Sequence, residues 1–188
     1  MKVISKSELG TVIIQPTIFD DGRGYFYESF NDEWFRKNVA DITFIQDNQS
    51  MSAKYVVRGM HWQNPPYAQA KLVRVVKGTV IDFAVDIRKG SPTYGKYAYA
   101  ILSDENHYQF YIPEGFAHGF IALDDNTIFQ YKVNNVYNKE SEGSFNVNDK
   151  QVNLPINKFV GSSIIIRANK DIDAPELAKA NNKFEYND

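Results

Sequence analysis

Three histidines are the side chains of this sequence best suited to moving protons near neutral pH: His61, His107 and His118. Charged residues stand close to them in the chain. Lys71 and Asp82 fall in strongly apolar stretches, where burying a charge is costly unless a partner or a polar ligand offsets it. The chain has no cysteine, which excludes a thiolate nucleophile and a disulfide framework. The residue types therefore favour acid–base chemistry.

The spacing of the histidines argues against a metal site. Small β-barrels that bind metal through histidine usually present two of them one residue apart, so that both point to one face of a strand. The stretch GMHWQ (residues 59–63) has glutamine where the second histidine would stand, and no glutamate follows closely. We expect no metal, with a three-histidine site built from loops as the minor alternative.

Alternation along an extended chain predicts the surroundings of His61. In VRGMHWQ (residues 57–63), Gly59 and His61 would share one face and Arg58 would point to the other. Gly59 would leave room for a ligand to approach His61 closely. The competing interpretation of His61 is a hydrogen-bonded structural histidine.

Two aspartates lie four residues apart in IDFAVDIR (residues 81–88) and would share a strand face. Asp82 could pair with Lys71 or His61, whereas a pair between Asp86 and Arg88 at a strand end needs no functional explanation.

Tyr131 is the candidate proton donor of the set. It follows Phe129 by two positions, so the two side chains would share a strand face. An inward Tyr131 opposite an inward histidine and lysine would form an acid–base pair, and core packing is the alternative.

A series of short strands would position these side chains. Runs rich in β-branched and aromatic residues alternate with turn signals, and about ten short strands predict a β-sandwich or barrel. The expected strands cover residues 11–19, 25–30, 43–46, 55–58, 70–76, 79–87, 96–102, 109–112, 119–123 and 127–133.

Turns and helices complete the expected pattern. Lys77-Gly78 is typical of a tight hairpin turn, and further turns are expected at residues 91–95 and 104–106. Asn31 or Asp32 would cap a short helix that ends at Asn38. A helical pattern returns only in residues 174–180, near the C-terminus.

Length and composition fit one domain over residues 1–188, with a barrel core from about 11 to 135 and a C-terminal segment packed on it. The net charge of −2 gives no sign of a nucleic-acid surface. The N-terminal residues do not form a signal peptide, and no apolar run approaches the ~20 residues that span a membrane. We expect a cytoplasmic protein that binds neither nucleic acid nor a membrane.

Several longer stretches, in the same order, resemble the dTDP-4-dehydrorhamnose 3,5-epimerase family, from Phe19 to about Leu177. They are DGRGYFYESFN (21–31), FIQDNQS (44–50), VVRGMHWQ (56–63), AQAKLVRVVKGTVIDFAVDIRKGSPTYGKY (68–97), YIPEGFAHGF (111–120) and FQYK (129–132). The resemblance implies an all-β, cupin-like jelly-roll barrel and an isomerase without metal or other cofactor. It also implies a homodimer that exchanges an N-terminal segment.

The resemblance assigns roles as well. His61 matches the family's general base, Tyr131 its proton donor and Lys71 the lysine near the keto oxygen of the sugar. Asp171 matches the aspartate that orients the base, and Asp82 an inward carboxylate beside it. The implied substrate-binding residues are Arg23, Glu28, Gln46, Asp47, Asn48, Arg58, Lys71, His118, Tyr137, Glu142 and Lys170.

The implied reaction inverts C3 and C5 of a dTDP-4-keto-6-deoxyhexose through an enolate, in deoxysugar synthesis for a polysaccharide. The departures lie at the nucleotide end: Val136-Tyr137 stands where the family has two tyrosines, the first stacking on thymine. Such a loss would weaken base binding by roughly 1–3 kcal/mol. The alternatives are inversion of one carbon only on a dTDP-linked or other nucleotide-linked sugar, a sugar ketoisomerase, and a non-catalytic sugar-binding jelly roll.

Overall fold

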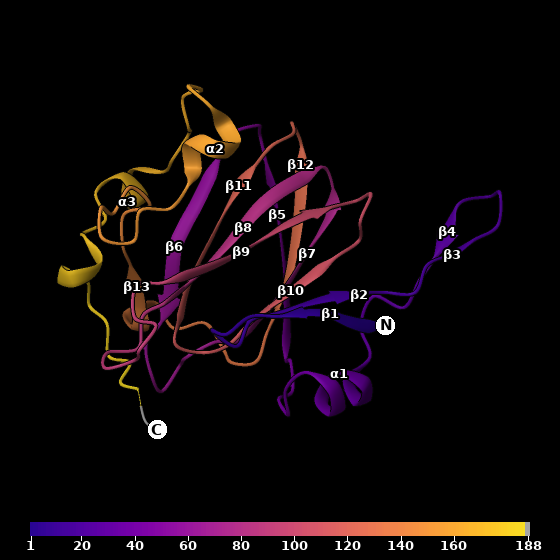
Figure 1. The fold of residues 1–188 in the computed structure, drawn as a ribbon, viewed down its shortest axis with the longest axis horizontal. Helices are drawn as coiled ribbons and strands as arrows, with labels where there is room; N and C mark the ends of the chain where they lie inside the picture. The colour runs from indigo at the N-terminus through magenta and orange to yellow at the C-terminus, as the bar shows by residue number, and fades with distance from the viewer. Residues whose placement is uncertain (187–188) are drawn as a thin grey trace.

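Two antiparallel β-sheets pack face to face in the computed structural model, which describes residues 1–186 (Figure 1). The six-stranded sheet has the order β1 (Lys2–Lys6), β2 (Val12–Gln15), β10 (Gln109–Ile112), β7 (Lys71–Lys77), β12 (Thr127–Val133) and β5 (Gln46–Ser52). The five-stranded sheet has the order β13 (Glu142–Ser144), β6 (Val57–Gln63), β11 (Phe116–Ala122), β8 (Thr79–Asp86) and β9 (Tyr97–Ser103). The all-β prediction is confirmed.

The core between the sheets follows from the two-residue period of the strands. Val73 and Val75 of β7 face Val80 and Ala84 of β8, and Phe129 of β12 packs into the same cluster. Each large apolar side chain that is fully buried contributes about 1.5–3 kcal/mol. This packing fixes which face of each strand is left for polar side chains.

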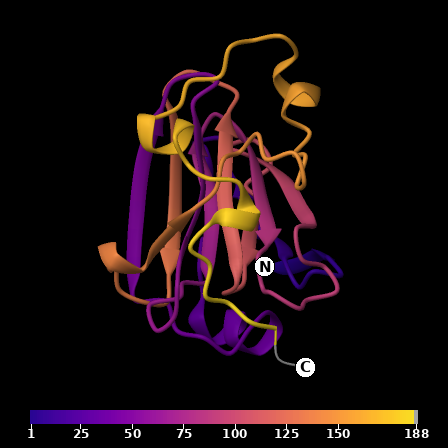
Figure 2. The ribbon, with the colours of Figure 1, turned by 90° about the vertical axis from the view of Figure 1, so that its left-hand side faces the viewer.

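The five-stranded sheet is buried on its outer face too. Met60, Trp62 and Phe83 pack there against Leu154 and Leu177 of the C-terminal segment. That segment carries α2 (Ile156–Val160) and α3 (Asn169–Ile172), and Figure 2 shows it, coloured orange to yellow, crossing in front of the strands. The cover of this sheet therefore comes from the chain beyond residue 144.

The predicted N-terminal helix is confirmed as α1 (Asp32–Asn38). Asn31 caps it, because its Oδ1 accepts a hydrogen bond from the backbone N–H of Trp34 at 2.9 Å. Phe35 is buried against Phe44 and Tyr111. The helix therefore closes the outer face of the six-stranded sheet near β2 and β10.

The two strands expected before this helix, at residues 11–19 and 25–30, are present only in part. Pro16, which has no N–H to donate, follows β2, and the chain then forms the small hairpin β3 (Phe19–Asp20) and β4 (Tyr25–Phe26). The hairpin extends away from both sheets (Figure 1), and its Phe26 is 71% exposed.

The hairpin expected at Lys77-Gly78 is wrong, because β7 and β8 lie in different sheets. The chain crosses between the sheets at Gly78, whose φ is +83°, and a Cβ there would lie 2.7 Å from Thr127 Oγ1. Glycine is therefore required at a corner between sheets rather than in a hairpin turn.

Smaller differences concern the remaining elements. The strand expected at residues 43–46 begins only at Gln46 and continues to Ser52 as β5, and β1 and β13 were not expected. Residues 174–180 form only a 3₁₀ turn, Leu177–Lys179, because the backbone N–H of Leu177 donates to Asp149 Oδ2 rather than to a helical carbonyl. A further 3₁₀ turn covers Lys139–Ser141. Within residues 1–186, no helix is both long and apolar enough to cross a membrane.

Candidate active site

A cavity of about 630 Å³ gathers most of the polar residues singled out above. Its walls come from β5, β6, β7, β11 and β12 and from residues 166–171. The expected site residues that line it are Asn48, Arg58, His61, Lys71, His118, Tyr131, Lys170 and Asp171.

His61 and Asp171 form a hydrogen-bonded pair in this cavity. His61 Nε2 lies 2.6 Å from Asp171 Oδ1, and the side chains are 32% and 3% exposed. Burial raises the pKa of Asp171, but hydrogen bonds from His61 and from the backbone N–H of Gly59 outweigh burial and hold it below its ordinary value. Asp171 is therefore a carboxylate that accepts the Nε2 proton, and the lone pair of His61 is on Nδ1. A histidine held in this way is suited to act as a base.

Arg58 lines the same cavity as His61, so the expectation that they point to opposite faces is wrong. The pairing of β6 with β11 matches His61 with His118 and Arg58 with Phe120. Two residues of β6, Gly59 and Met60, thus stand opposite one residue of β11. This β-bulge shifts the alternation by one position and brings Arg58 and His61 to the same side of the sheet.

Gly59 serves the approach of two strands rather than the approach of a ligand, which corrects the expectation. Its φ is +124°, and a Cβ at this position would lie 2.5 Å from the Cα of Gly119 on β11. Only glycine fits a backbone that is both left-handed and this close to its neighbour.

Asp82 pairs with His118, not with His61. His118 Nε2 lies 2.9 Å from Asp82 Oδ2, and His118 Nδ1 lies 3.5 Å from Lys71 Nζ. Burial raises the pKa of Asp82, although His118 and Lys71 oppose the rise. Burial also lowers the pKa of Lys71 to about 8, with Asp82 opposing that shift.

The expected ion pair between Asp86 and Arg88 is confirmed. Arg88 Nη2 lies 2.7 Å from Asp86 Oδ2, so Asp86 needs no functional explanation.

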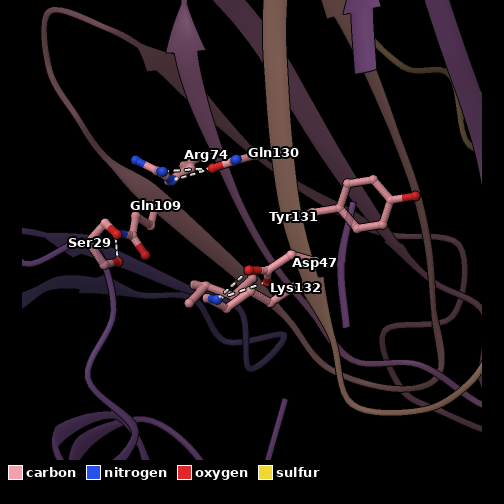
Figure 3. Close-up of a pocket in the computed structure, with 8 residues that line it drawn as sticks. Ser29, Asp47, Arg74, Gln109, Gln130, Tyr131 and Lys132 are labelled. Carbon is pink, nitrogen blue, oxygen red and sulfur yellow. Dashed lines mark hydrogen bonds and ion pairs between the residues drawn. The ribbon is translucent and has the colours of Figure 1, made fainter. Parts of the chain in front are cut away.

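Tyr131 points into the cavity from β12. Figure 3 shows its ring extending away from the pairs that Lys132 forms with Asp47 and Arg74 forms with Gln130. Its ring centroid is 5.9 Å from Lys71 Nζ. Burial raises the pKa of Tyr131, against a smaller opposite effect of Arg58. The phenol is therefore protonated at neutral pH and can donate.

Several expected substrate-binding residues lie outside the cavity. Arg23 is in the projecting hairpin, exposed and paired with Asp21. Glu28 accepts a hydrogen bond from Asn31, and Asp47 pairs with Lys132 on the outer face of the six-stranded sheet. The others outside the cavity are Gln46, Tyr137 and Glu142.

The cavity also includes residues that sequence reasoning missed. Arg167 lines it four residues before Asp171, and its Nη1 donates to Asn146 Oδ1 at 3.1 Å. A parallel bridge between Val56 and Ile166 lays this segment beside β6. No periodic signal marks it, since it has little regular structure. Gln49 and Ser50 belong to the FIQDNQS stretch and could have been included. Across residues 1–186, no cluster of three or more histidine, aspartate or glutamate side chains could hold a metal ion.

The sequence of the chain matches a family of known proteins. A family model described as dTDP-4-dehydrorhamnose 3,5-epimerase matches residues 7–179. A relative of that name from Shigella flexneri is 48% identical over 177 residues, which cover 93% of this chain and 98% of the relative.

Solved structures are similar over the same length. The dTDP-4-dehydrorhamnose 3,5-epimerase of Elizabethkingia anophelis is 43% identical with a TM-score of 0.85, covering 95% of this chain and 97% of that one. A dTDP-6-deoxy-D-glucose-3,5-epimerase of Legionella pneumophila, in complex with dTDP-4-keto-L-rhamnose, is 40% identical with a TM-score of 0.88, covering 95% and 93%. The predicted cupin-like jelly roll is thereby confirmed.

Proposed function

The chain belongs to the dTDP-4-dehydrorhamnose 3,5-epimerase family, and from that premise we propose which step of the reaction each residue of its cavity carries out. It is an isomerase that inverts C3 and C5 of dTDP-4-dehydro-6-deoxyglucose to give dTDP-4-dehydrorhamnose. The observation that supports our assignment of roles is the His61–Asp171 pair, in a cavity that also holds Lys71 and Tyr131.

His61 is the base. The 4-keto group of the sugar acidifies the hydrogens on C3 and C5, and His61 Nδ1 takes one of them. The C–H electron pair moves into an enolate, and the Asp171 carboxylate stabilises the imidazolium that forms. General-base catalysis of this kind contributes about 10²- to 10⁴-fold to a rate.

Lys71 and Tyr131 complete the inversion. The ammonium of Lys71 stabilises the negative charge on the enolate oxygen, an effect worth about 10²- to 10³-fold for one well-placed donor. Tyr131 then gives its phenolic proton to the carbon from the face opposite His61. The imidazolium of His61 then loses its proton to solvent, and the phenolate of Tyr131 regains one from solvent. With both groups reset, the same sequence at the second carbon gives the doubly inverted sugar.

The diphosphate lies against the cations at the cavity wall. Arg58 and Lys170 both line the cavity, and a guanidinium matches phosphate oxygens through two parallel hydrogen bonds. Asn48 on β5 supplies a neutral donor on the same wall. Tyr137 and Glu142, which lie outside the cavity, contact the nucleoside end.

The active protein is a homodimer of single-domain subunits in the cytoplasm. Arg23 lies in a hairpin that projects away from its own cavity, and Phe19 and Phe26 are exposed on it. A projecting hairpin with exposed phenylalanines is suited to contact a second subunit. Arg23 and Glu28 reach the partner's cavity and bind the nucleotide there.

Proton NMR of dTDP-4-keto-6-deoxyglucose in deuterated water tests this proposal, with wild-type protein and His61→Ala compared. Deuterium at both C3 and C5, absent with the variant, is the expected result. Calorimetric titration with dTDP shows that the variant still has a folded site.

Two results would contradict the proposal. Deuterium at C3 alone would mean that only one carbon is inverted. No exchange with the wild-type protein would mean another nucleotide sugar or binding without catalysis, and CDP-, UDP- and GDP-linked 4-keto sugars separate these cases.

A further inference from the structure

His118 is the second histidine of the cavity, and the reaction proposed above uses it neither as acid nor as base. It is the direct partner of His61 in the pairing of β6 with β11. Each of the two histidines has its own aspartate: Asp171 for His61 and Asp82 for His118. The two pairs differ in exposure, since His118 and Asp82 are both buried whereas His61 is open to the cavity.

Both ring nitrogens of His118 have protein partners. Nε2 lies 2.9 and 3.0 Å from the two carboxylate oxygens of Asp82, and Nδ1 lies 3.5 Å from Lys71 Nζ. An ammonium can only donate hydrogen bonds and a carboxylate can only accept them. Nε2 therefore carries the proton and Nδ1 carries the lone pair. His118 is a neutral imidazole in one tautomer, with no ring nitrogen free for a phosphate oxygen.

The surroundings of His118 keep its imidazole ring uncharged and hold it in one orientation. Burial lowers the pKa of His118, and the positive charge of Lys71 and the nearby His61 add to this, while Asp82 opposes it. Its ring stacks on Phe129 at 6.1 Å between centroids and 19° between planes. Phe129 is itself buried in the core between the sheets. The direction of the Nδ1 lone pair is thus fixed by the fold.

The Lys71 ammonium needs an acceptor of this kind to hold it in place. Its ammonium is at the end of a flexible stem of four carbons, and a stabilising donor helps only if it stays where the negative charge develops. Resting on the function proposed above, we propose that His118 is a positioning residue, held by Asp82, that directs the Lys71 ammonium to the C4 oxygen of the sugar. This role differs from the one that the family resemblance implies, in which His118 contacts the substrate directly.

Two substitutions separate the two nitrogens of His118. In His118→Gln the amide can replace Nε2 and donate to Asp82, but no acceptor remains near Lys71. In His118→Asn the amide oxygen lies near the position of Nδ1 and can accept from Lys71, but Asp82 loses its donor. Steady-state kinetics with the 4-keto sugar, calorimetric titration with dTDP and thermal melting are measured for both.

We expect His118→Gln to melt like the wild type and bind dTDP equally well, while kcat falls by about 100-fold, the loss that a misplacement of about 1 Å can cause. His118→Asn should keep more of kcat than His118→Gln while melting at a lower temperature. Lys170→Met, a phosphate-contact control, should show the opposite pattern, with weaker dTDP binding and less change in kcat.

Weaker dTDP binding by His118→Gln at an unchanged kcat would overturn the proposal and make His118 a phosphate ligand. Unchanged binding with unchanged kcat would overturn it as well. Failure of the function itself is recognised separately, because the wild-type protein would then exchange no C–H hydrogen of the 4-keto sugar, whatever the variants do.

Discussion

His61 and Asp171 are 110 positions apart in the chain, and their side chains share a 2.6 Å hydrogen bond between Nε2 and Oδ1. The bond exists because the segment before α3 lies along the start of β6, bridged there by Val56 and Ile166. The C-terminal segment thus supplies the hydrogen-bond partner of His61 in addition to covering the sheet.

Asp171→Asn should lower kcat by about 10²- to 10⁴-fold while leaving dTDP affinity unchanged. The amide keeps the size of the side chain but removes the charge that stabilises the imidazolium. Steady-state kinetics and calorimetric titration with dTDP measure the two quantities. An unchanged kcat would mean that the pair is only structural.

Activity should fall as pH rises through about 8, the value to which burial lowers the pKa of Lys71. Below that pH Lys71 is an ammonium and stabilises the enolate, and above it the amine is neutral and the stabilisation is lost. A pH profile of kcat/KM shows this alkaline limb. Lys71→Arg should lack the limb, since a guanidinium stays charged throughout the range. A limb that persists in Lys71→Arg would assign it to another group.

Asp82→Asn should move the same limb to lower pH. Lys71 is faced by Asp82 from β8, by His118 from β11, by Tyr131 from β12 and by Arg58 from β6. Asp82 is the nearby negative charge that raises the pKa of Lys71, so its removal lowers that pKa further. The isosteric amide can still accept a hydrogen bond from His118. An unshifted limb would show that Asp82 has no electrostatic effect on Lys71.

Tyr131→Phe should separate hydrogen exchange from inversion. His61 can still remove a proton and return a deuteron to the same face, but no phenol donates from the opposite face. Inversion should therefore fall by about 10²- to 10⁴-fold, while deuterium still enters the unreacted sugar. NMR in deuterated water measures both rates in one sample, and a parallel loss of both would contradict the assigned role.

Gly59→Ala should lower the free energy of unfolding by about 3–5 kcal/mol, because strain and overpacking add at this position. Gly90→Ala is the matched control: its φ is also positive, at +85°, but a Cβ there meets nothing within 4 Å. The control should lose only about 1–2 kcal/mol. Chemical denaturation compares them, and equal losses would mean that the contact with Gly119 costs nothing.

Coexpression of Arg23→Ala with His61→Ala should restore part of the activity that each variant lacks at low substrate concentration. In a mixed dimer, the subunit that keeps His61 receives Arg23 from its partner. The loss of one charged hydrogen bond to the diphosphate weakens binding by about 1.5–3 kcal/mol. Coexpression of His61→Ala with Asp171→Ala should restore nothing, because every cavity then lacks one of the pair. Equal results would contradict the exchange of the hairpin.

Local patterns were sufficient for much of the fold. The strands at residues 109–112 and 127–133 and the helix ending at Asn38 were predicted with their observed bounds, because turn residues and an Asn cap mark their ends. The cavity gathers His61, Lys71 and Tyr131 because each lies on the inward face of a strand. Asp171 as the partner of His61 was expected only from the family resemblance, since no local signal joins α3 to β6.

The remaining differences arise from pairing between distant strands. Gly78 looks the same in sequence whether the chain turns within a sheet or crosses to another one. The face of Arg58 depends on one extra residue in β6, which only the pairing with β11 reveals. Asp82 was correctly placed inward, but its partner depends on which strand lies next to β8.

The bulge in β6 makes the distance in residues between Arg58 and His61 as important as the residues themselves. If β6 kept its length but paired with β11 without the bulge, Arg58 and His61 would be three regular positions apart and would point to opposite faces. Deleting Met60 would instead leave them two positions apart, on the same face, without needing a bulge. A variant library that only exchanges side chains never tests this, because every member keeps the same number of residues. A deletion of Met60 would therefore remove the bulge while keeping Arg58 and His61 on one side of the sheet, and it would separate the effect of the bulge from the effect of that orientation.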